Sequence, residues 1–176
     1  IKIAEKNGTE LTLLKVAPFI PKGARSILSP PVLAELRAAL QARHEARLQP
    51  LVDLATQAGL SGKTVVRDGV PFLEIIREVL SSNHDLVLKA ADGEGMTDIV
   101  FGAEDKHLLR KCPCPVWLVT PRGTQRSPRI LAAVDPDSSE SEQEALSRDV
   151  LRIAIEAAQL DSAPLDVLHA WHLFGE

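Results

Sequence analysis

The residues best placed to do chemistry lie in one stretch, Asp85 to Val119, with the sequence DLVLKAADGEGMTDIVFGAEDKHLLRKCPCPVWLV. It begins with a short apolar run that is typical of a buried strand. An acidic segment with Gly93 and Gly95 follows, and such glycines let a backbone turn tightly or approach a ligand closely. A helix over residues 104–110 and a strand over residues 116–119 complete the stretch. The order predicts a βαβ unit, and parallel sheets bind ligands at such loops.

Two further groups of side chains invite a chemical interpretation. Cys112 and Cys114 lie near His107, but Cys-x-Cys in which each cysteine is followed by a proline is not a usual zinc spacing, and we interpret these cysteines as small side chains packed before an edge strand. His169 and His172 lie three residues apart around a predicted strand, so they point to opposite faces and are poorly placed to share a metal. No Ser–His–Asp or Cys–His pattern has a context suited to nucleophilic catalysis. These residues predict no metal site and give no support for an enzyme.

The composition indicates an aliphatic core and a mild charge. The chain has 176 residues, enough for one domain and part of another, with 45% apolar and 3% aromatic residues. A formal net charge of −4 gives no reason to expect a nucleic acid as partner. No apolar run is long enough to predict a membrane span. The two cysteines are a poor disulfide framework, which favours a reduced, cytoplasmic protein.

Strands and helices alternate between residues 10 and 119. Pro50 lies inside the longest predicted helix and should either kink it or mark a break. Gly69 follows a predicted strand, where it either lines a ligand pocket or is a plain turn glycine. The alternation predicts an α/β fold, in which helices cover both faces of an open parallel sheet. The predicted strands are 10–16, 63–67, 85–88 and 116–119, and the predicted helices are 32–58, a segment from 71 onward, and 104–110.

A second βαβ pattern follows a proline-containing linker. It consists of a strand from Arg129 to Asp135, a helix over residues 142–159 and a strand from Leu165. The segments 11–16 and 165–170 match as a weak internal repeat, so the first copy is expected to lack an opening strand and most of a helix. We therefore divide the chain into a first domain (1–121), a linker (122–128) and the start of a second domain (129–176).

These segments together resemble the universal stress proteins. The stretch from Asp85 to Val119 is similar to that family's fourth strand, ligand loop, fourth helix and fifth strand. Arg129 to Asp135 resembles the family's first strand with its terminal aspartate. The segments 107–113 and 167–171 are similar to the tandem, E-type members, which carry two such domains in one chain. The resemblance implies a Rossmann-like five-stranded parallel sheet, a tandem arrangement and a role in the stress response.

The nucleotide-binding members of this family carry the pattern Gly, two residues, Gly, nine residues, then Gly and Ser or Thr. Such glycines bring backbone N–H groups against phosphates, and the hydroxyl adds a donor. In this chain the four positions fall on Lys89, Asp92, Gly102 and Ala103, so one glycine is kept. Gly93 and Gly95 have the wrong spacing to replace the others, and the Asp92 carboxylate would repel a triphosphate. We predict that the first domain does not bind ATP in the family's usual way.

Asp135 stands where family members contact the ribose of a nucleotide. A carboxylate that accepts hydrogen bonds from two hydroxyls is reasonable chemistry at the carboxyl end of a strand. An aspartate that begins a turn before Pro136 is an equal alternative. The resemblance thus leaves ATP open as a ligand of the second domain and disfavours it in the first.

The strand formed by Val116, Trp117, Leu118 and Val119 is the predicted association site. An apolar edge strand left bare is prone to pair with another strand. In family dimers this strand pairs with its counterpart, so the expected partner is either the second domain or a second copy of the chain. Trp117 is expected in the core or in that interface.

Three functions are compatible with these residues. The first is a non-enzymatic regulatory or ligand-binding protein of the stress response, whose ligand is a nucleotide in one half or a small, apolar molecule in the half with the altered loop. The alternative is an ATP-binding stress protein with slow hydrolysis through its second domain. A scaffold for other proteins, without a small-molecule ligand, is the third.

Overall fold

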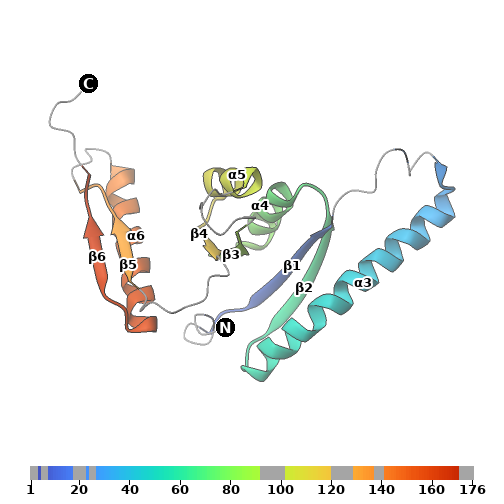
Figure 1. Cartoon of the computed structure of the whole chain (residues 1–176), viewed down its shortest axis with the longest axis horizontal. Coiled ribbons are helices and arrows are strands. Elements are labelled where there is room, and N and C mark those ends of the chain that lie inside the picture. The colour runs from blue at the N-terminus through green and yellow to red at the C-terminus, as the bar shows by residue number, and fades with distance from the viewer. Residues whose placement is uncertain are drawn as a thin grey trace. The chain divides into compact units, whose positions relative to one another are not determined.

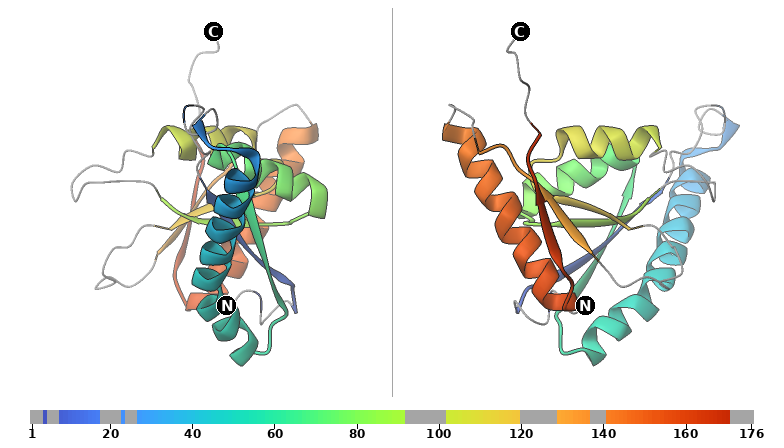
Figure 2. Two further views of the ribbon diagram at one scale, coloured as in Figure 1. Left: turned by 90° about the vertical axis from the view of Figure 1, so that its right-hand side faces the viewer. Right: turned by 60° about the vertical axis from the view of Figure 1, so that its left-hand side comes forward.

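The computed structural model describes residues 4, 8–17, 23, 27–91, 102–119, 129–136 and 141–170. The chain divides into two compact units, Ile3–Pro121 and Arg122–Glu176, which are described one at a time. Figure 1 labels their helices and strands, and Figure 2 shows the same elements from two further sides.

The first unit alternates strands and helices, which confirms the predicted α/β pattern. The ladder between its first two strands continues to Gly69, whose N–H donates to the carbonyl of Ala17 at 3.0 Å. The elements are β1 (Leu11–Ala17), α3 (Pro30–Gln57), β2 (Gly62–Asp68), α4 (Pro71–Ser82), β3 (Val87–Ala90), α5 (Ala103–Lys111) and β4 (Val116–Val119).

The strands of this unit pair in parallel, two by two. β1 pairs with β2 from Leu11 opposite Gly62 onward, and β3 pairs with β4 from Val87 opposite Val116 onward. These are two separate two-stranded sheets among the described residues, so the single five-stranded sheet stays a prediction. Figure 1 shows each pair as two arrows that run in the same direction.

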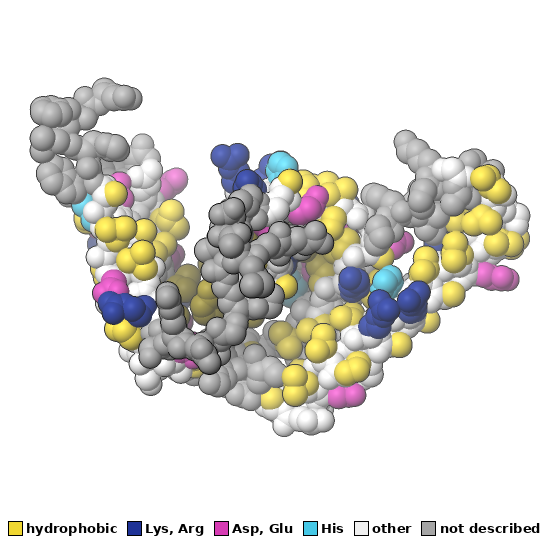
Figure 3. All heavy atoms as spheres, viewed as in Figure 1, with side chains coloured by type: hydrophobic (Ala, Val, Ile, Leu, Met, Phe, Trp, Pro, Cys, Tyr) yellow, Lys and Arg dark blue, Asp and Glu magenta, His cyan; other side chains and the backbone are white. Residues whose placement is uncertain are grey.

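α3 continues through Pro50 as one helix of 28 residues, so Pro50 does not break it. A proline lacks one N–H donor, yet the hydrogen bonds on either side of it hold the helix together. Gly59, with φ +75°, lies just beyond the end of the helix, in the backbone region that glycine adopts most readily. Ala55 is buried, whereas apolar side chains along the rest of α3 lie at the surface (Figure 3). These include Val32, Leu36, Leu51 and Leu54.

α4 has the predicted apolar face but also buries two carboxylates that the sequence did not indicate. Val79 is buried in the predicted stripe, and Glu74 and Glu78 are buried with it. Glu78 accepts hydrogen bonds from Arg67 of β2, at 2.5 and 3.2 Å, and from Ser82 at 3.0 Å. The Arg67 hydrogen bond holds the pKa of Glu78 below its usual value, against the opposing effect of burial. This ion pair fixes α4 on β2.

β3 begins two residues later than the sequence predicted. Its ladder with β4 starts where the N–H of Val87 donates to the carbonyl of Pro115, and it ends where the N–H of Ala91 donates to Val119. Because β4 is itself bounded by Pro115, Asp85 has no facing residue and lies outside the strand.

The second unit is a single βαβ element. Its parts are β5 (Ile130–Ala133), α6 (Ser141–Asp161) and β6 (Leu165–Leu168), and β5 pairs with β6 in parallel, with Ile130 opposite Leu165. Ala132 of β5 and Ala154 and Ala158 of α6 are buried, so small side chains let the helix lie close to the strands. Both strands are shorter than predicted. Within the part of the chain that is described, no helix is long and apolar enough to cross a membrane.

Candidate functional site

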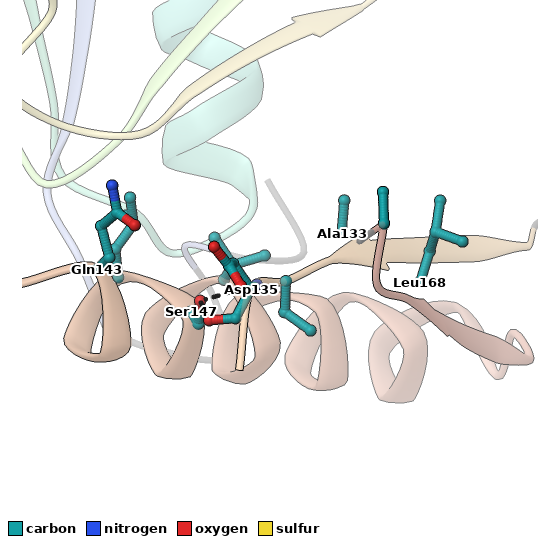
Figure 4. A pocket seen from close by; sticks show the side chains of 9 residues that line it. Ala133, Asp135, Gln143, Ser147 and Leu168 are labelled. Carbon is teal, nitrogen blue, oxygen red and sulfur yellow. Dashed lines mark hydrogen bonds between the residues drawn. The ribbon is translucent and has the colours of Figure 1, made fainter. Parts of the chain in front are cut away.

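The second unit contains a cavity of about 420 Å³ at the carboxyl ends of β5 and β6 (Figure 4). Ligands of open α/β sheets bind at this end of the strands, beside the helix that follows the first strand. Ala133 and Leu168, the last residues of the two strands, form part of its wall. Leu146 and Val150 of α6 supply further apolar surface. The cavity is therefore apolar on its sides, and its polar groups come from the loop after β5 and from α6.

Asp135 lies at the edge of this cavity, and its backbone is fixed to α6. Its N–H donates to the hydroxyl of Ser147 at 3.2 Å, and that hydroxyl donates to the Asp135 carbonyl at 3.2 Å. The N–H of Val134 donates to the carbonyl of Leu168, which continues the ladder up to this point. Ser147 thus holds the Asp135 backbone, while the carboxylate is 56% exposed at the cavity. This placement agrees with a binding role and also with a turn before Pro136.

His169 lies beside Asp135, which the sequence interpretation did not anticipate. Its Nδ1 is 3.2 Å from the carbonyl oxygen of Val134 and 3.9 Å from Oδ1 of Asp135. The sequence predicts His169 within a strand together with His172, whereas β6 ends at Leu168 and His172 lies outside the described residues. Because β5 and β6 pair in parallel, the residues that follow the two strands lie at the same edge of the sheet.

Gln143 and Ser147 were also missed. They lie four residues apart on α6, hence on one helix face, and both line the cavity (Figure 4). With Asp135 they give the cavity an amide, a hydroxyl and a carboxylate beside apolar walls. Such a set can orient a small ligand that carries hydroxyl or amino groups. Among the described residues, no group of three or more His, Cys, Asp or Glu side chains is arranged to hold a metal.

In the first unit, Lys89 is drawn into a buried ion pair. Its Nζ donates to Oδ1 of Asp105 at 2.9 Å and to the carbonyl of Ala90 at 3.0 Å. The Asp105 side chain is fully buried, and that of Lys89 is 19% exposed. The sequence resemblance aligns Lys89 with the first glycine of the family's phosphate pattern. In the structure, the charge of Lys89 ties β3 to the first turn of α5.

A second carboxylate of α5 occupies the beginning of α4. The N–H of Phe72, in the first turn of α4, donates to Oε2 of Glu104 at 3.2 Å. The Phe72 ring stacks on His107 with centroids 4.9 Å apart, and the ammonium of Lys111 lies 5.5 Å from the Phe72 centroid. An α-helix carries partial positive charge at this end. Glu104 therefore supplies from within the protein the anion that such an end favours.

The remaining loop positions divide into three groups. Gly102 caps α5 and Ala103 is its exposed first residue, so the position of the family's hydroxyl carries a methyl group. Gly69 is buried against Glu74: an added Cβ would lie 2.6 Å from the Glu74 Cγ, so any side chain at this position would force Glu74 to move. Asp92, Gly93 and Gly95 lie outside the described residues.

β4 presents an apolar face on the first unit. Trp117 lies opposite Leu88 of β3, and both are partly exposed, at 39% and 51%. Val119 of β4 is 53% exposed on the same face, whereas Val116 and Leu118 are half-buried on the other. Trp117 is thus a surface residue of this strand pair rather than a buried core residue.

The order of elements, the parallel strand pairs and a cavity at the strand ends define a Rossmann-like α/β protein. The universal stress protein family matches residues 1–120, and the chain belongs to that family. Universal stress protein E of Escherichia coli K12 is 41% identical over 96 residues, which are 54% of this chain and 30% of that protein. Universal stress protein E of Photorhabdus laumondii is 28% identical over 160 residues, which are 90% of this chain and 51% of that protein. The chain thus spans at most about half the length of these relatives.

Solved structures support the same fold. A protein of unknown function from Pseudomonas aeruginosa PAO1 superposes with a TM-score of 0.70 and 22% identity, and the match covers 97% of this chain and 53% of that chain. A universal stress protein from Archaeoglobus fulgidus has a TM-score of 0.64 and 17% identity, with 98% of this chain and 63% of that chain covered. The membership makes this a stress-response type of protein with an α/β Rossmann-like fold.

Proposed function

We propose that the chain is a non-enzymatic, ligand-binding regulatory protein of the stress response, whose ligand binds beside Asp135 and whose first domain does not use the family's ATP loop. The observation that carries this proposal is the buried pair of Lys89 and Asp105. Both cysteines are free thiols, which fits the reducing cytoplasm as its compartment.

The ion pair argues against a triphosphate for electrostatic reasons. A lysine at a phosphate loop could attract a phosphate, but the Lys89 ammonium is already neutralised by Asp105 at 2.9 Å. The Glu104 carboxylate at the start of α4 adds negative charge, and like charges disfavour phosphate binding. At two of the pattern's positions, Lys89 and Asp92 take the place of glycine. Their longer side chains keep the backbone N–H groups from approaching a phosphate as closely as glycine would allow.

The Asp135 cavity favours a ligand with an apolar body and a hydroxylated or amino-bearing end. Its walls are apolar, and its carboxylate, amide and hydroxyl come from Asp135, Gln143 and Ser147. Native mass spectrometry of the full-length protein from its host tests this proposal, because a ligand that survives purification appears as added mass. The added mass should disappear in an Asp135→Ala variant. Retention of the same mass in that variant would refute the assignment of the site.

The runner-up is an ATP-binding stress protein that hydrolyses ATP slowly through its second domain. The position of the Asp135 carboxylate at the carboxyl edge of β5 and β6 favours this alternative. Phosphate contacts would then have to come from a loop outside residues 129–176. Phosphate release from ATP by the full-length protein, abolished by Asp135→Ala, would support the runner-up. Its absence, together with a co-purified ligand that is not a nucleotide, supports the first proposal.

We also propose that the two strand pairs of the first unit belong to one open five-stranded sheet in a tandem protein with domains 1–121 and 129–176 joined by 122–128. The usual order of such sheets, 3-2-1-4-5, would place one more strand between β1 and β3. The chain's span of about half of a longer relative supports this proposal. In a longer protein with that strand, amide exchange should slow along β1 and β3 but not along β2 and β4.

The partner proposed for β4 is a second universal stress domain, within the chain or in a second copy. Its apolar residues Trp117 and Val119 are exposed, and β4 pairs only with β3 among the described strands. Light scattering at tens of micromolar protein tests whether two copies of the chain associate. We expect a dimer that Val119→Lys converts to a monomer, while Leu51→Lys on exposed α3 leaves it unchanged. A monomeric wild-type chain would contradict the pairing of copies.

A further inference from the structure

The chain's two cysteines lie together where α5 passes into β4. Cys112 caps α5, with its N–H donating to the carbonyl of Leu108 at 2.9 Å, and Cys114 precedes β4 by two residues. Their Sγ atoms are 3.7 Å apart. A disulfide joins sulfurs about 2.0 Å apart, so the atoms must approach by roughly 1.7 Å. Rotation about the two Cα–Cβ bonds, with a small adjustment of the turn at Pro113, can supply such a shift.

Small molecules can reach the Cys114 sulfur from one side. Cys114 lines an open cavity of about 400 Å³ that it shares with His84 and Asp85, and both cysteines are half-buried. A water molecule takes about 30 Å³ of liquid volume, so a hydroperoxide fits this space easily. His84 and Asp85 could suggest a metal, but the described residues hold no group of three ligands arranged for one. Thiol chemistry is therefore the chemistry that this site offers.

We propose that Cys112 and Cys114 form a reversible redox site, in which a hydroperoxide converts the two thiols into an intramolecular disulfide. This site is separate from the Asp135 cavity and does not depend on the proposed function. It would make the junction of α5 and β4 responsive to oxidants.

The reaction balances in two steps. The thiolate of one cysteine attacks one peroxide oxygen: an S–O bond forms, the O–O bond breaks, and the other oxygen leaves as water or an alcohol after taking up a proton. That cysteine is then a sulfenic acid, oxidised by two electrons. The sulfur of the other cysteine attacks the sulfenic sulfur next: an S–S bond forms, the S–O bond breaks, and the hydroxyl leaves as water with the proton of the second thiol. A thiol reductant restores both thiols by exchange.

The two sulfurs are in direct contact, and burial, followed by the hydrogen bond and charge interaction with Cys112, raises the pKa of Cys114 to about 12. The ring that closes contains three residues, and so short a loop adds little stability through chain entropy. Oxidation should therefore change the chemistry of the junction without acting as a structural staple.

Intact-mass measurement of the 176-residue chain tests this proposal. The reduced protein is treated with hydrogen peroxide, blocked with N-ethylmaleimide and weighed. We expect monomeric protein that has lost two hydrogen atoms and carries no maleimide, and dithiothreitol should restore two modifiable thiols. Because Cys112 and Cys114 are the only cysteines, the bridge needs no further assignment. Cys112→Ser and Cys114→Ser must both fail to form it.

Several results would overturn the proposal. Two maleimides on the wild-type chain, after peroxide exposure that fully oxidises free glutathione, would show that the thiols do not pair. Disulfide-linked dimers of the wild-type chain, or sulfonic acids in place of a bridge, would refute an intramolecular disulfide. The wild-type readout does not depend on whether either variant folds.

Discussion

Replacing Lys89 by methionine should destabilise the first unit strongly. The substitution keeps most of the side chain's length but removes the charge that neutralises fully buried Asp105 at 2.9 Å. The gross attraction at that distance is roughly 6 kcal/mol at an effective dielectric constant of about 20. Removing one partner of a buried pair costs about 3–5 kcal/mol, because the other charge stays buried without compensation. Lys89 keeps some solvent exposure, so we expect a loss of about 3 kcal/mol in the free energy of unfolding.

Urea unfolding followed by the fluorescence of Trp117 measures this loss. Trp117 lies in β4, opposite Leu88, the neighbour of Lys89 on β3. The chain's second tryptophan is removed by Trp171→Phe in every variant, so that the signal reports on the first unit. Lys106→Met is the matched control, since Lys106 is exposed on α5, the helix that carries Asp105. It should change the free energy of unfolding by no more than about 0.5 kcal/mol.

A loss below about 1 kcal/mol in Lys89→Met would refute the buried-pair interpretation. The double variant Lys89→Met with Asp105→Leu gives a second check, because an apolar pair can replace a buried ion pair at little cost. We expect it to be more stable than Lys89→Met alone. Simple addition of the two single losses would mean that Lys89 and Asp105 act independently.

Two further predictions concern α4. Gly69→Ala would place a Cβ 2.6 Å from the Glu74 Cγ, so Glu74 must move and the free energy of unfolding should fall by about 1–3 kcal/mol. Gly62→Ala is the control: its Cβ would lie 3.7 Å from the nearest atom, and the free energy of unfolding should change by no more than about 0.5 kcal/mol. Thermal unfolding compares the two variants. The pKa of Glu78 is lower in the folded than in the unfolded protein, so the stabilisation from its hydrogen bond with Arg67 is fully present above about pH 4.5 and is lost as pH falls through the folded-state pKa. Urea midpoints measured against pH should therefore fall less steeply in acid for Glu78→Gln than for the wild type, and parallel curves would contradict the prediction.

The fold was predictable where local patterns decide it. Apolar spacing gave the alternation of strands and helices, and Gly59 marked the end of α3 as glycines commonly do. Strand ends were less predictable, because they depend on the partner strand: β3 is bounded by the extent of β4 rather than by its own sequence. Pro50 was ambiguous for a related reason, since the rest of α3 decides whether the helix continues.

The candidate sites depended on contacts that no local pattern contains. Lys89 and Asp105 meet across 16 positions of the sequence, and Glu104 reaches the start of α4 from 32 positions away. Glu78 falls on the buried side of α4, where periodicity alone would expect an apolar residue, because Arg67 of a neighbouring strand compensates its charge. Asp135 could be identified because it follows a predicted strand. Its contact with Ser147 could not, because that contact depends on where α6 packs.

Calorimetric titration of Mg-ATP into the full chain carrying Asp135→Ala tests the central claim most directly. The variant removes the proposed binding carboxylate of the second domain and leaves the first domain, with Lys89 paired to Asp105, unchanged. We predict heats of dilution only, because we propose that the first domain does not use the family's phosphate loop and Lys89 is held there by Asp105. Saturable binding of one ATP per chain in this variant would contradict the account.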